Sequence, residues 1–431
     1  MKKKILLIQP ENQDIRRFRK WQLNNFVQAT IPYLAAYIDE SIYQITLADE
    51  YNQKIPYHQH FDLVAITVNT PNAMHCYQMA RKFHETGAKV AMGGPHATLM
   101  PHEVAEHCDF LLTGECEDTW PLFLREFYQD IPQKIYTPVS PPTLQNLPHP
   151  RWDLVRSRNR TMKAAVIATR GCPYHCRYCN LKQIYFDICR TRPVAEVIRA
   201  IEAMPSKFFV FWDDNLFGNK AYAMELLQGM KPLRKRWAAQ VTLADCAHPG
   251  LLQAARDAGC LYLFVGLESF SSGAMEDAGK PVNKVDEYKK LIGDIHAHKI
   301  LVQSGVVFGF DSDTRDVFAQ TLAACEALGI DGATVSLLTP LPQTPIYRQF
   351  KEEGRLLTQD WAHYNGKTHV AFVPKNMTPD ELFEGYMAFR KKFYSLRSFW
   401  KRMRVSRTHL LYNFYINLGY RLALKKPGKR G

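Results

Sequence analysis

Three cysteines lie close together in the segment GCPYHCRYCN, at Cys172, Cys176 and Cys179. Thiolates at this spacing can surround one inorganic centre. A structural zinc site needs four protein ligands and often supplies them as two CxxC pairs, but no second CxxC pair is present. A 4Fe–4S cluster also has four ligand positions, so three cysteines would leave one iron open. Three unrelated loop cysteines, or a zinc site completed by a remote ligand such as His175, are the alternatives.

The spacing C-x3-C-x-aromatic-C, with Tyr178 as the aromatic residue, resembles the signature of the radical S-adenosylmethionine (SAM) superfamily. The resemblance implies that the open iron binds the amino and carboxylate groups of SAM, with Tyr178 beside it. An external one-electron donor of the flavodoxin or ferredoxin type then drives cleavage of SAM to methionine and a 5′-deoxyadenosyl radical. The implied cofactors, a 4Fe–4S cluster and SAM, carry the chemistry, and the protein positions them.

The elements that must position this loop form a repeating strand–helix pattern. The cysteines follow the first of six predicted strands, and helical patterns separate these strands. Six units are fewer than the eight of a closed TIM barrel, so the sequence predicts a partial (β/α)6 TIM-like barrel over residues 161–345. The predicted strands span residues 164–170, 208–214, 237–243, 262–269, 301–310 and 331–340.

Polar residues end several of these strands. Taken singly, each is a helix N-cap or a loop residue. At successive carboxyl ends of a barrel, a ligand site is the better interpretation. The resemblance implies SAM contacts at Asp213, Asp214, Glu268, Ser269 and Val307, the last in the segment GVVFG, which resembles the adenine-contacting G-x-I-x-G. One departure is that the glutamate that often follows that segment is replaced by Ser312, with Asp311 and Asp313 beside it.

The remaining chain divides into three parts. Residues 1–130 alternate strand and helix, which predicts a Rossmann-like parallel sheet with helices on both faces. Six prolines between Pro132 and Pro150 predict a stiff, extended linker over 131–160. Residues 346–431 are expected to be mainly helical, beginning a helix at the capping box Thr378-Pro379-Asp380-Glu381 and ending in a basic, aromatic tail. The predicted fold class is therefore α/β with a helical C-terminal region.

An N-terminal parallel sheet before such a barrel resembles the cobalamin-binding subgroup of the superfamily, on segments such as KVAMGGPHA and DFLLTGE. Glycines would let a flat macrocycle approach the backbone. One departure is the absence of a D-x-H-x-x-G loop, which implies that no histidine of that loop ligates cobalt. A sheet that binds no cobalamin and only docks the barrel is the alternative. The cobalamin contacts implied are Thr67, Asn69, Thr70, Gly93, Gly94, Pro95 and His96.

The other cysteines argue against a second cluster of the kind found in tRNA-modifying methylthiotransferases. Cys108 and Cys116 flank the predicted strand 109–114, so they should lie on the order of 20 Å apart. Cys76 falls within a helical pattern and is expected to be buried.

The basic charge is concentrated at the C-terminal end. The chain carries a net charge of +13, and residues 391–431 contain Lys and Arg but no Asp or Glu. A solvated basic helix, a helix resting on anionic lipid, and an RNA-binding segment all fit this composition, and lipid is preferred over nucleic acid. No secretory signal or membrane span is evident, so a cytoplasmic location is expected, with peripheral contact at the inner membrane surface.

These features predict a cobalamin-dependent radical SAM enzyme, a C-methyltransferase acting on an unactivated carbon of a hydrophobic or polycyclic substrate. In the implied reaction, one SAM methylates reduced cobalamin, a second generates a substrate radical, and that radical takes the methyl group. The alternatives are a cyclase or rearrangement enzyme on a tetrapyrrole or lipid, a tRNA-modifying radical SAM enzyme, and a non-catalytic metal-binding or membrane-surface adaptor.

Overall fold

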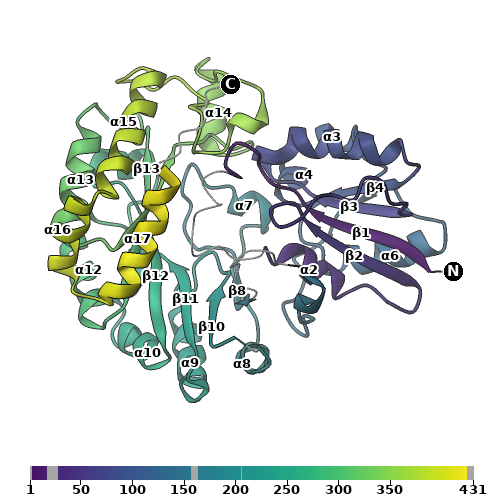
Figure 1. The fold of residues 1–431 in the computed structure, drawn as a ribbon, viewed down its shortest axis with the longest axis horizontal. Coiled ribbons are helices and arrows are strands. Elements are labelled where there is room, and N and C mark those ends of the chain that lie inside the picture. Colours follow the sequence, from purple (N-terminus) through teal and green to yellow (C-terminus); the bar gives the residue numbers. More distant parts are fainter. Residues whose placement is uncertain (1, 17–27, 157–163, 205, 425–431) are drawn as a thin grey trace.

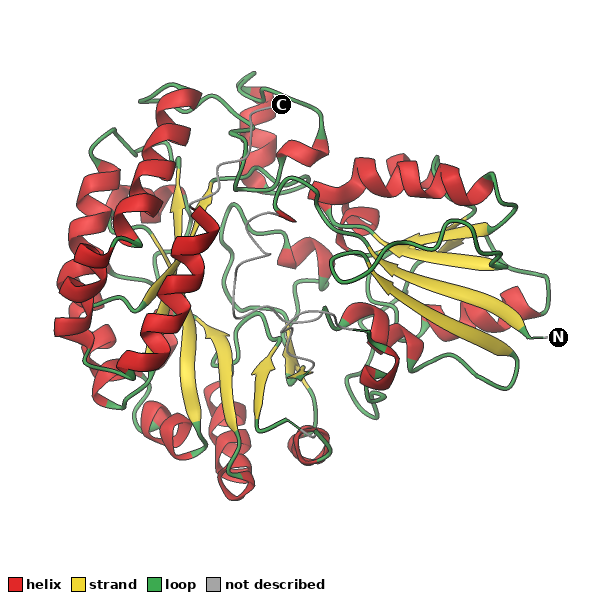
Figure 2. Cartoon of the chain, in the orientation of Figure 1, coloured by secondary structure: helices red, strands yellow, loops and turns green. Residues whose placement is uncertain are grey.

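The chain forms two α/β lobes that lie side by side (Figure 1). The structure is a computed structural model, and it describes residues 2–16, 28–156, 164–204 and 206–424. The first lobe is N-terminal, and the second contains the remaining sheet strands and the C-terminal helices. Helices cover both faces of the first sheet and the outer side of the second (Figure 2).

The first sheet contains six parallel strands in the order β2-β1-β3-β4-β5-β6. Its central strands are buried on both faces, which is why they are nearly continuous apolar runs. The order reverses between β1 and β3, and ligands of such sheets bind beyond the carboxyl ends of the strands at this point. The strands are β1 (Lys3–Gln9), β2 (Tyr43–Asp49), β3 (Leu63–Thr67), β4 (Lys89–Gly93), β5 (Phe110–Leu112) and β6 (Ile135–Tyr136).

Helices pack this sheet from two sides and form two separate apolar cores. The elements are α2 (Thr30–Ala35), η1 (Thr70–Asn72), α3 (Ala73–His84), α4 (Pro95–Leu99), α5 (Pro101–Ala105) and α6 (Thr119–Tyr128).

The predicted linker is only partly an extended connection. Its residues Ile135–Tyr136 pair with β5 as the sixth strand of the first sheet, and Trp152–Leu154 form a short 3-10 turn, η2. This pairing satisfies the backbone hydrogen-bonding groups at the edge of β5. The proline content of the segment gave no sign of this sixth strand. The predicted domain boundaries at 130 and 160 stay predictions.

The second sheet also has six parallel strands, in the order β14-β13-β12-β11-β10-β7. Among the described residues, β14 and β7 do not pair with one another, as the partial-barrel prediction requires. The strands are β7 (Ala165–Val166), β10 (Phe208–Phe211), β11 (Arg236–Val241), β12 (Cys260–Glu268), β13 (Leu301–Phe308) and β14 (Gly332–Leu337). The covering helices are α8 (Val194–Glu202), α9 (Lys220–Met230), α10 (Leu251–Asp257), α11 (Ser272–Asp277), α12 (Tyr288–Ala297) and α13 (Val317–Leu328).

The first predicted strand of this sheet, 164–170, is broken into two. β7 ends at Val166, and β8 (Thr169–Arg170) turns away to pair antiparallel with β9 (Arg190–Thr191). The carboxylate of Asp213 accepts hydrogen bonds from the amides of Ala168 and Thr169, which holds the chain in this turn. The cysteine loop therefore begins from a hairpin and not from a sheet strand.

The C-terminal region packs on the outside of the second lobe, with α16 and α17 in yellow in Figure 1. The predicted capping box is present: Thr378 accepts from the amide of Glu381, and Glu381 accepts from the amide of Thr378. The elements are α14 (Pro345–Glu352), η6 (Trp361–His363), α15 (Pro379–Phe393), α16 (Leu396–Ser406) and α17 (Leu410–Leu424).

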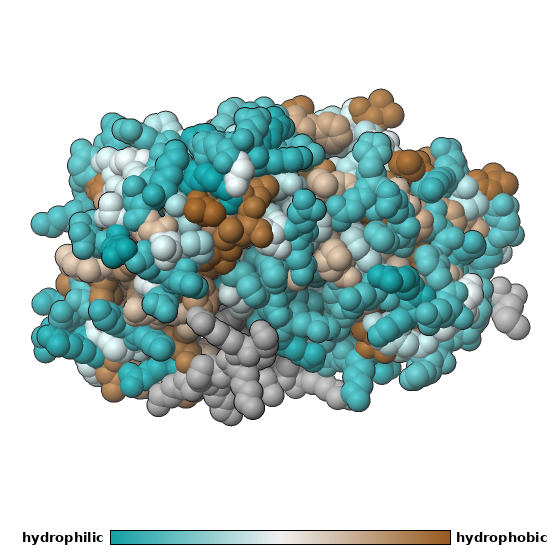
Figure 3. All heavy atoms as spheres, turned by 90° about the horizontal axis from the view of Figure 1, so that it is seen from above, coloured by the Kyte–Doolittle hydropathy of each residue, from teal (hydrophilic) through white to brown (hydrophobic). Residues whose placement is uncertain are grey.

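The surface seen from above is mostly hydrophilic, with a group of hydrophobic residues near its middle and smaller ones toward its edges (Figure 3). Within the described ranges, no helix has both the length and the apolar character needed to cross a bilayer.

Candidate active site

A cavity of about 830 Å³ lies between the two lobes. The carboxyl ends of the first sheet supply one wall, and β7, the cysteine-bearing hairpin and the end of β10 supply the other. This placement joins the two regions that the sequence analysis treated separately. The lining includes Thr67, Asn69, Gly93, Gly94, Pro95 and Glu115 from the first lobe, and Ala165, Ile167, Arg170, Tyr185, Trp212 and Asp214 from the second.

The cysteine loop follows β8 and precedes α7 (Leu181–Ile184). Cys172, Cys176 and Cys179 are all partly buried, and the amide of Cys179 donates to the carbonyl of Cys176 across a tight turn (3.1 Å). Burial raises the pKa of Cys172 to about 11 and that of Cys179 to about 12. These thiols would deprotonate only on binding a metal, which is the ordinary coupling of thiolate ligation to proton release.

Gly171 fixes where this loop begins. It has φ +86°, and a Cβ there would lie 2.5 Å from the carbonyl oxygen of Ile188. The loop thus starts from a close contact between two backbones that only glycine permits.

The described side chains include no group of three His, Cys, Asp or Glu residues that converges to hold a single metal ion. His175 is mostly exposed and lies 3.3 Å from Asp187. The three thiolates of a cluster bind different irons, so they need not converge on one point.

A buried ion pair lies beside the cysteines. Lys280 Nζ lies 2.8 Å from Glu268 Oε1 and donates to the carbonyl of Gly266 (2.8 Å). Both side chains are nearly inaccessible to solvent. Burial opposes the charged form, but the carboxylate of Glu268 and the thiols of Cys176 and Cys172 raise the pKa of Lys280. The site therefore has a fixed positive charge next to its metal-ligating loop.

Lys280 is not among the predicted site residues, since it lies outside any motif, in the turn after α11. That turn reaches the cysteine loop because the amide of Arg177 donates to the carbonyl of Ala278 (2.9 Å).

Glu268 adopts a left-handed backbone conformation, φ +64°, at a register shift where β12 ends. A non-glycine residue held there is strained, and such strain persists where the surrounding contacts impose it. Tyr178 is close to this carboxylate, and burial together with Glu268 raises the pKa of the Tyr178 phenol.

The two neighbouring aspartates differ in their surroundings. Asp213 is buried, and its carboxylate accepts from the amides of Ala168 and Thr169 and from Thr169 Oγ1. Burial raises the pKa of Asp213 to about 7. Asp214 lines the cavity and accepts from the amide of Gly171 (3.0 Å). Asp214 is thus available to a ligand, whereas Asp213 holds the hairpin.

Ser269 and Val307 occupy different places. The Ser269 hydroxyl is buried and accepts from the amide of Ser271 (3.1 Å), so it caps the turn before α11. Val307 is partly buried, and its neighbours Val306 and Phe308 belong to the helix-side core. By strand alternation, Val307 faces the inside of the sheet.

The loop after GVVFG is held by Asp313. Its carboxylate accepts from the amides of Gly309 (2.8 Å) and Phe310 (3.1 Å), and burial raises its pKa to about 6. An acidic residue therefore stabilises this loop even though Ser312 replaces the expected glutamate.

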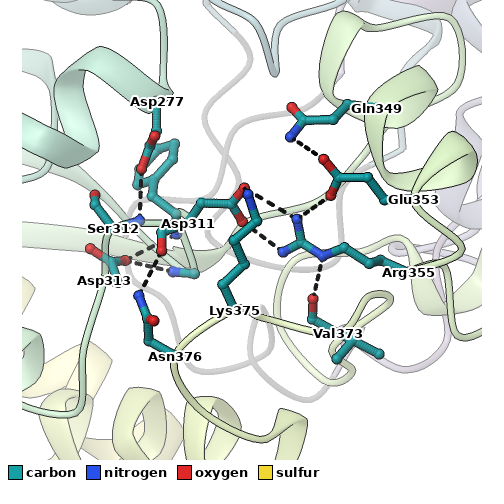
Figure 4. Close-up of polar contacts among 12 residues, drawn as sticks. Asp277, Asp311, Ser312, Asp313, Gln349, Glu353, Arg355, Val373, Lys375 and Asn376 are labelled. Atoms are coloured by element: carbon teal, nitrogen blue, oxygen red, sulfur yellow. Dashed lines mark hydrogen bonds and ion pairs between the residues drawn. The ribbon is translucent and has the colours of Figure 1, made fainter.

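The C-terminal region braces the same loop, as Figure 4 shows. The guanidinium of Arg355 binds both carboxylate oxygens of Asp311 (2.6 and 3.1 Å), and Lys375 pairs with the same carboxylate (2.9 Å). Asn376 donates to the carbonyl of Asp311 (2.8 Å). These contacts tie the segment around residues 353–376 to the end of β13.

The first sheet presents a glycine cradle to the cavity. Gly94 has φ +103°, and a Cβ there would lie 2.9 Å from Thr67 Oγ1 and 3.1 Å from the backbone of Val68. A Cβ on Gly93 would lie 3.2 Å from the carbonyl oxygen of Leu112. Close packing therefore requires glycine at these two positions, and the backbone of both residues lies at the cavity wall.

His96 and Thr70 do not line the cavity. The imidazole is fully buried, with Nδ1 3.2 Å from Thr70 Oγ1 and Nε2 3.5 Å from Glu103. Its ring contacts Trp361 edge-on. In this conformation His96 packs the first lobe against the C-terminal region and does not reach the cobalamin-sized space, so its predicted cofactor contact lacks geometric support.

A buried charge cluster joins the two lobes at the cavity wall, and sequence reasoning did not identify it. Arg170, directly before the cysteine loop, pairs with Glu115 and Glu117 of the first lobe, and Arg190 also pairs with Glu115. Tyr33 donates to Glu117 (2.8 Å). Despite burial, Arg170 lowers the pKa of Glu117. Only spatial proximity, which the sequence does not show, relates these residues.

Comparisons with known proteins agree with this geometry. A family model described as the radical SAM superfamily matches residues 166–325, and one described as a domain of unknown function, DUF4070, matches residues 344–414. The bacteriochlorophyllide d C-12(1)-methyltransferase of Chlorobaculum tepidum is 28% identical over 94% of this chain and 90% of its own length. The hopanoid C-2 methylase of Rhodopseudomonas palustris is 26% identical over 68% of this chain and 58% of its own length.

Solved structures share the fold. The radical SAM methyltransferase TsrM from Kitasatospora setae, with cobalamin and a 4Fe–4S cluster bound, superposes with a TM-score of 0.66 at 15% identity, covering 90% of this chain and 88% of that one. The cobalamin-dependent radical SAM enzyme OxsB, with aqua-cobalamin and SAM bound, gives a TM-score of 0.67 at 13% identity, covering 96% of this chain and 72% of that one.

Proposed function

Because the chain belongs to the radical SAM superfamily, we propose that it is a cobalamin-dependent radical SAM enzyme that methylates an unactivated carbon of a hydrophobic, polycyclic substrate. The observation that supports this most strongly is a cavity bounded by both the cysteine-bearing hairpin and the Gly93–Gly94 cradle. Two cofactors that must exchange a methyl group and a radical with one substrate need such a shared space.

The residues have distinct roles in this proposal. Cys172, Cys176 and Cys179 hold the cluster, and the cavity-facing carboxylate of Asp214 binds the ammonium group of SAM. The buried ammonium of Lys280 favours the SAM carboxylate next to the cysteine loop. When bound, the cluster with SAM supplies a carbon-centred radical and cobalamin supplies the methyl group.

The first lobe binds cobalamin through the ends of its strands. Gly93 and Gly94 admit the macrocycle, and the side chains of Thr67 and Asn69 offer polar atoms at its rim. The aromatic residues Tyr185 and Trp212 of the second lobe and Trp152 of the connecting segment line the cavity and exclude water from the reacting groups.

The substrate class follows from the relatives and the lining. Proteins with the printed activities of bacteriochlorophyllide and hopanoid methylation share sequence with this chain. Both substrates are large, apolar ring systems, and the aromatic lining suits such molecules. Cyclisation of a tetrapyrrole, tRNA modification and a non-catalytic adaptor role remain the competing functions, and product mass distinguishes them.

The test is anaerobic reconstitution followed by reduction with dithionite in the presence of SAM. We expect a brown protein with about four irons, in line with a three-cysteine cluster, and formation of 5′-deoxyadenosine. The Cys176→Ser variant should lose both, whereas Cys189→Ser, a change at an exposed cysteine outside the motif, should keep both. Protein from cobalamin-fed cells should carry a corrinoid absorption band. Absence of SAM cleavage would support the adaptor, and absence of the corrinoid would support a docking-only first lobe.

An electron donor is required by this chemistry, and we propose a flavodoxin or ferredoxin. Replacing dithionite with either reduced protein should restore 5′-deoxyadenosine formation.

We further propose that α17 contacts an anionic membrane surface. The polar side chains of this helix face the protein, where Asn413 and Asn417 donate to Asp331. Its large apolar side chains face solvent, with Leu411 80% and Tyr415 60% exposed. Rings extend the apolar face to α16, since Phe399 contacts both Phe414 and Trp400. Exposed arginines lie at positions 397 and 404 of the adjoining helix α16 and at position 407 directly after it. An apolar, aromatic helix face with cations beside it suits an interfacial helix.

Vesicle flotation tests this surface. The protein should float with phosphatidylglycerol vesicles and not with phosphatidylcholine vesicles, and Leu411→Glu should reduce flotation several-fold. Leu357→Glu, at an exposed leucine outside α17, serves as the control. Binding of the protein to RNA, abolished by the same α17 change, would instead support the nucleic-acid alternative, which is not expected.

A further inference from the structure

Lys367 lies in a loop that joins the two lobes. At one end of the loop, Trp361 packs into the core of the first lobe and its indole donates to Glu103 (2.9 Å). At the other end, the carbonyl of Gly366 accepts from the amide of Leu337 on the edge strand β14 (2.9 Å). The backbone on the N-terminal side of Lys367 is thereby fixed to both lobes.

The ammonium of Lys367 lies at the inner face of the second sheet. It donates to the carbonyl of Val335 (2.7 Å) and to Ser336 Oγ (3.3 Å). Val335 and Leu337 belong to the helix-side core, so the side chain of Ser336 between them faces inward. The inner face is also where Val307 and the cavity-lining Trp212 lie, and Lys367 itself is not among the residues that line the cavity between the lobes.

This ammonium lacks a counter-ion. Within the described part of the chain, no carboxylate lies within ion-pair distance of Lys367 Nζ, although the side chain is partly buried. Its charged neighbour is another cation, Arg390. Burial, with the positive charge of Arg390 added, lowers the pKa of Lys367 to about 7. A partly buried lysine beside an arginine is costly unless an anion arrives.

We propose that Lys367 binds a carboxylate group at the far edge of a substrate that extends from the cavity along this inner face, a deduction that rests on the proposed function of the cavity. An ammonium group has three N–H donors, and two are already used, so one remains. One donor suits one oxygen of a carboxylate better than the several oxygens of a phosphate.

The position of Lys367 also constrains the size of the substrate. β14 lies four strands from β10, whose carboxyl end carries Trp212. At about 4.8 Å per strand this is on the order of 20 Å along the sheet, and less across its concave face. A ligand that touches both positions must be a large ring system with its acid group at one edge.

The test compares acids with their methyl esters, using the full-length protein without reductant. The probes are pheophorbide a, a chlorin with one free propionate, and lithocholic acid, a steroid acid. Binding is measured by tryptophan fluorescence quenching or by calorimetry. Wild-type protein should bind one of the acids about tenfold or more tightly than its ester, as expected for a charge-assisted hydrogen bond.

Lys367→Met should reduce affinity for that acid to the level of the ester and leave ester binding unchanged. Lys367→Arg should retain most of the acid preference, and Lys284→Met, at an exposed lysine paired with Glu287, should have no effect. Equal binding of acid and ester by the wild type with both probes would overturn the proposal. So would loss of acid and ester alike in Lys367→Met, because that pattern indicates a structural role.

The failure of this proposal is separable from failure of the proposed function. The same preparations are assayed for corrinoid absorption and for 5′-deoxyadenosine. Their absence would refute the radical SAM assignment of the site, whereas a missing acid preference in a protein that still cleaves SAM would refute only the role of Lys367.

Discussion

At the residue scale, the site depends on a few buried charges whose partners are distant in sequence. Lys280 and Glu268 form an ion pair that is nearly closed to solvent. Burying two charges is favourable only when each has its partner and further hydrogen bonds. Here the carbonyl of Gly266 supplies one such bond, and a Cβ at that position would displace the ends of both side chains.

Removing one partner of this pair should be strongly destabilising. Lys280→Met should lower the free energy of unfolding by about 3–5 kcal/mol, because it leaves a buried carboxylate uncompensated. The measurement is anaerobic urea denaturation of the reconstituted protein. Adding Glu268→Gln should recover part of this loss, and strictly additive effects would show that the two groups do not interact.

Asp213 should make stability depend on pH. Its folded pKa is about 7, above the usual carboxyl value of about 3.9, so between these values the folded state holds a proton that the unfolded state has released. Stability contributed by Asp213 is therefore present below about pH 4 and falls as the pH rises to about 7. Thermal melts of wild type and Asp213→Asn should diverge across this window. The melting temperature of Asp257→Asn, at a surface site, should change with pH as the wild type does. The same pH dependence in Asp213→Asn would contradict a raised pKa for Asp213.

At the element scale, loops beyond the strand ends determine the site more than the strands do. The hairpin β8–β9 turns the cysteine loop toward the first lobe, and the β4–α4 turn forms the cradle opposite. Each turn contains a glycine at positive φ, Gly171 in the first and Gly94 in the second, and at both positions a Cβ would lie within 3 Å of a neighbouring atom.

Substitutions at two glycines in the first lobe distinguish destabilisation by backbone strain from destabilisation by steric contact. Gly94→Ala and Gly87→Ala both place a side chain at positive φ, but a Cβ at Gly87 has nothing within 4 Å. Backbone strain should lower the free energy of unfolding of each variant by about 1 kcal/mol. In Gly94→Ala, overpacking should lower it by about 1–3 kcal/mol more. Gly94→Ala should also lose the corrinoid band, whereas Gly87→Ala should keep it. Equal behaviour of the two variants would show that the cradle is not close-packed.

At the scale of the whole molecule, the two lobes are joined by charge as well as by packing. Arg170 and Arg190 of the second lobe meet Glu115 and Glu117 of the first at the cavity wall. The C-terminal region adds a second junction, where Trp361 enters the core of the first lobe. The relative position of the cofactor sites depends on both junctions.

Arg170→Met should loosen the first junction. Two buried carboxylates would lose their main partner, so we expect the free energy of unfolding to fall by about 3 kcal/mol or more. Limited proteolysis should then cleave within 131–160 faster than in the wild type. Lys231→Met, which removes an exposed pair with Asp257, should change neither property. Unchanged proteolysis of Arg170→Met would mean that packing alone holds the lobes.

The sequence by itself determined the cofactor chemistry and the architecture. A thiol spacing is local, and strand and helix periods are local, so C-x3-C-x2-C and the alternation of elements predicted the cluster loop, two parallel sheets and the helical C-terminal region. The family resemblance added Asp214, Gly93 and Gly94 as expected ligand contacts at strand ends, and all three line the cavity.

Only the tertiary structure decided which of these groups face one another. Lys280, the Arg170–Glu115–Glu117 cluster and Lys367 lie outside any motif, and their partners are far away in the chain, so no local pattern reveals them. The same limit explains His96, which was predicted beside the cofactor and is instead enclosed by Thr70, Glu103 and Trp361. The free energy of a buried charge or ring depends on every neighbour that surrounds it, and those neighbours are assembled only by folding.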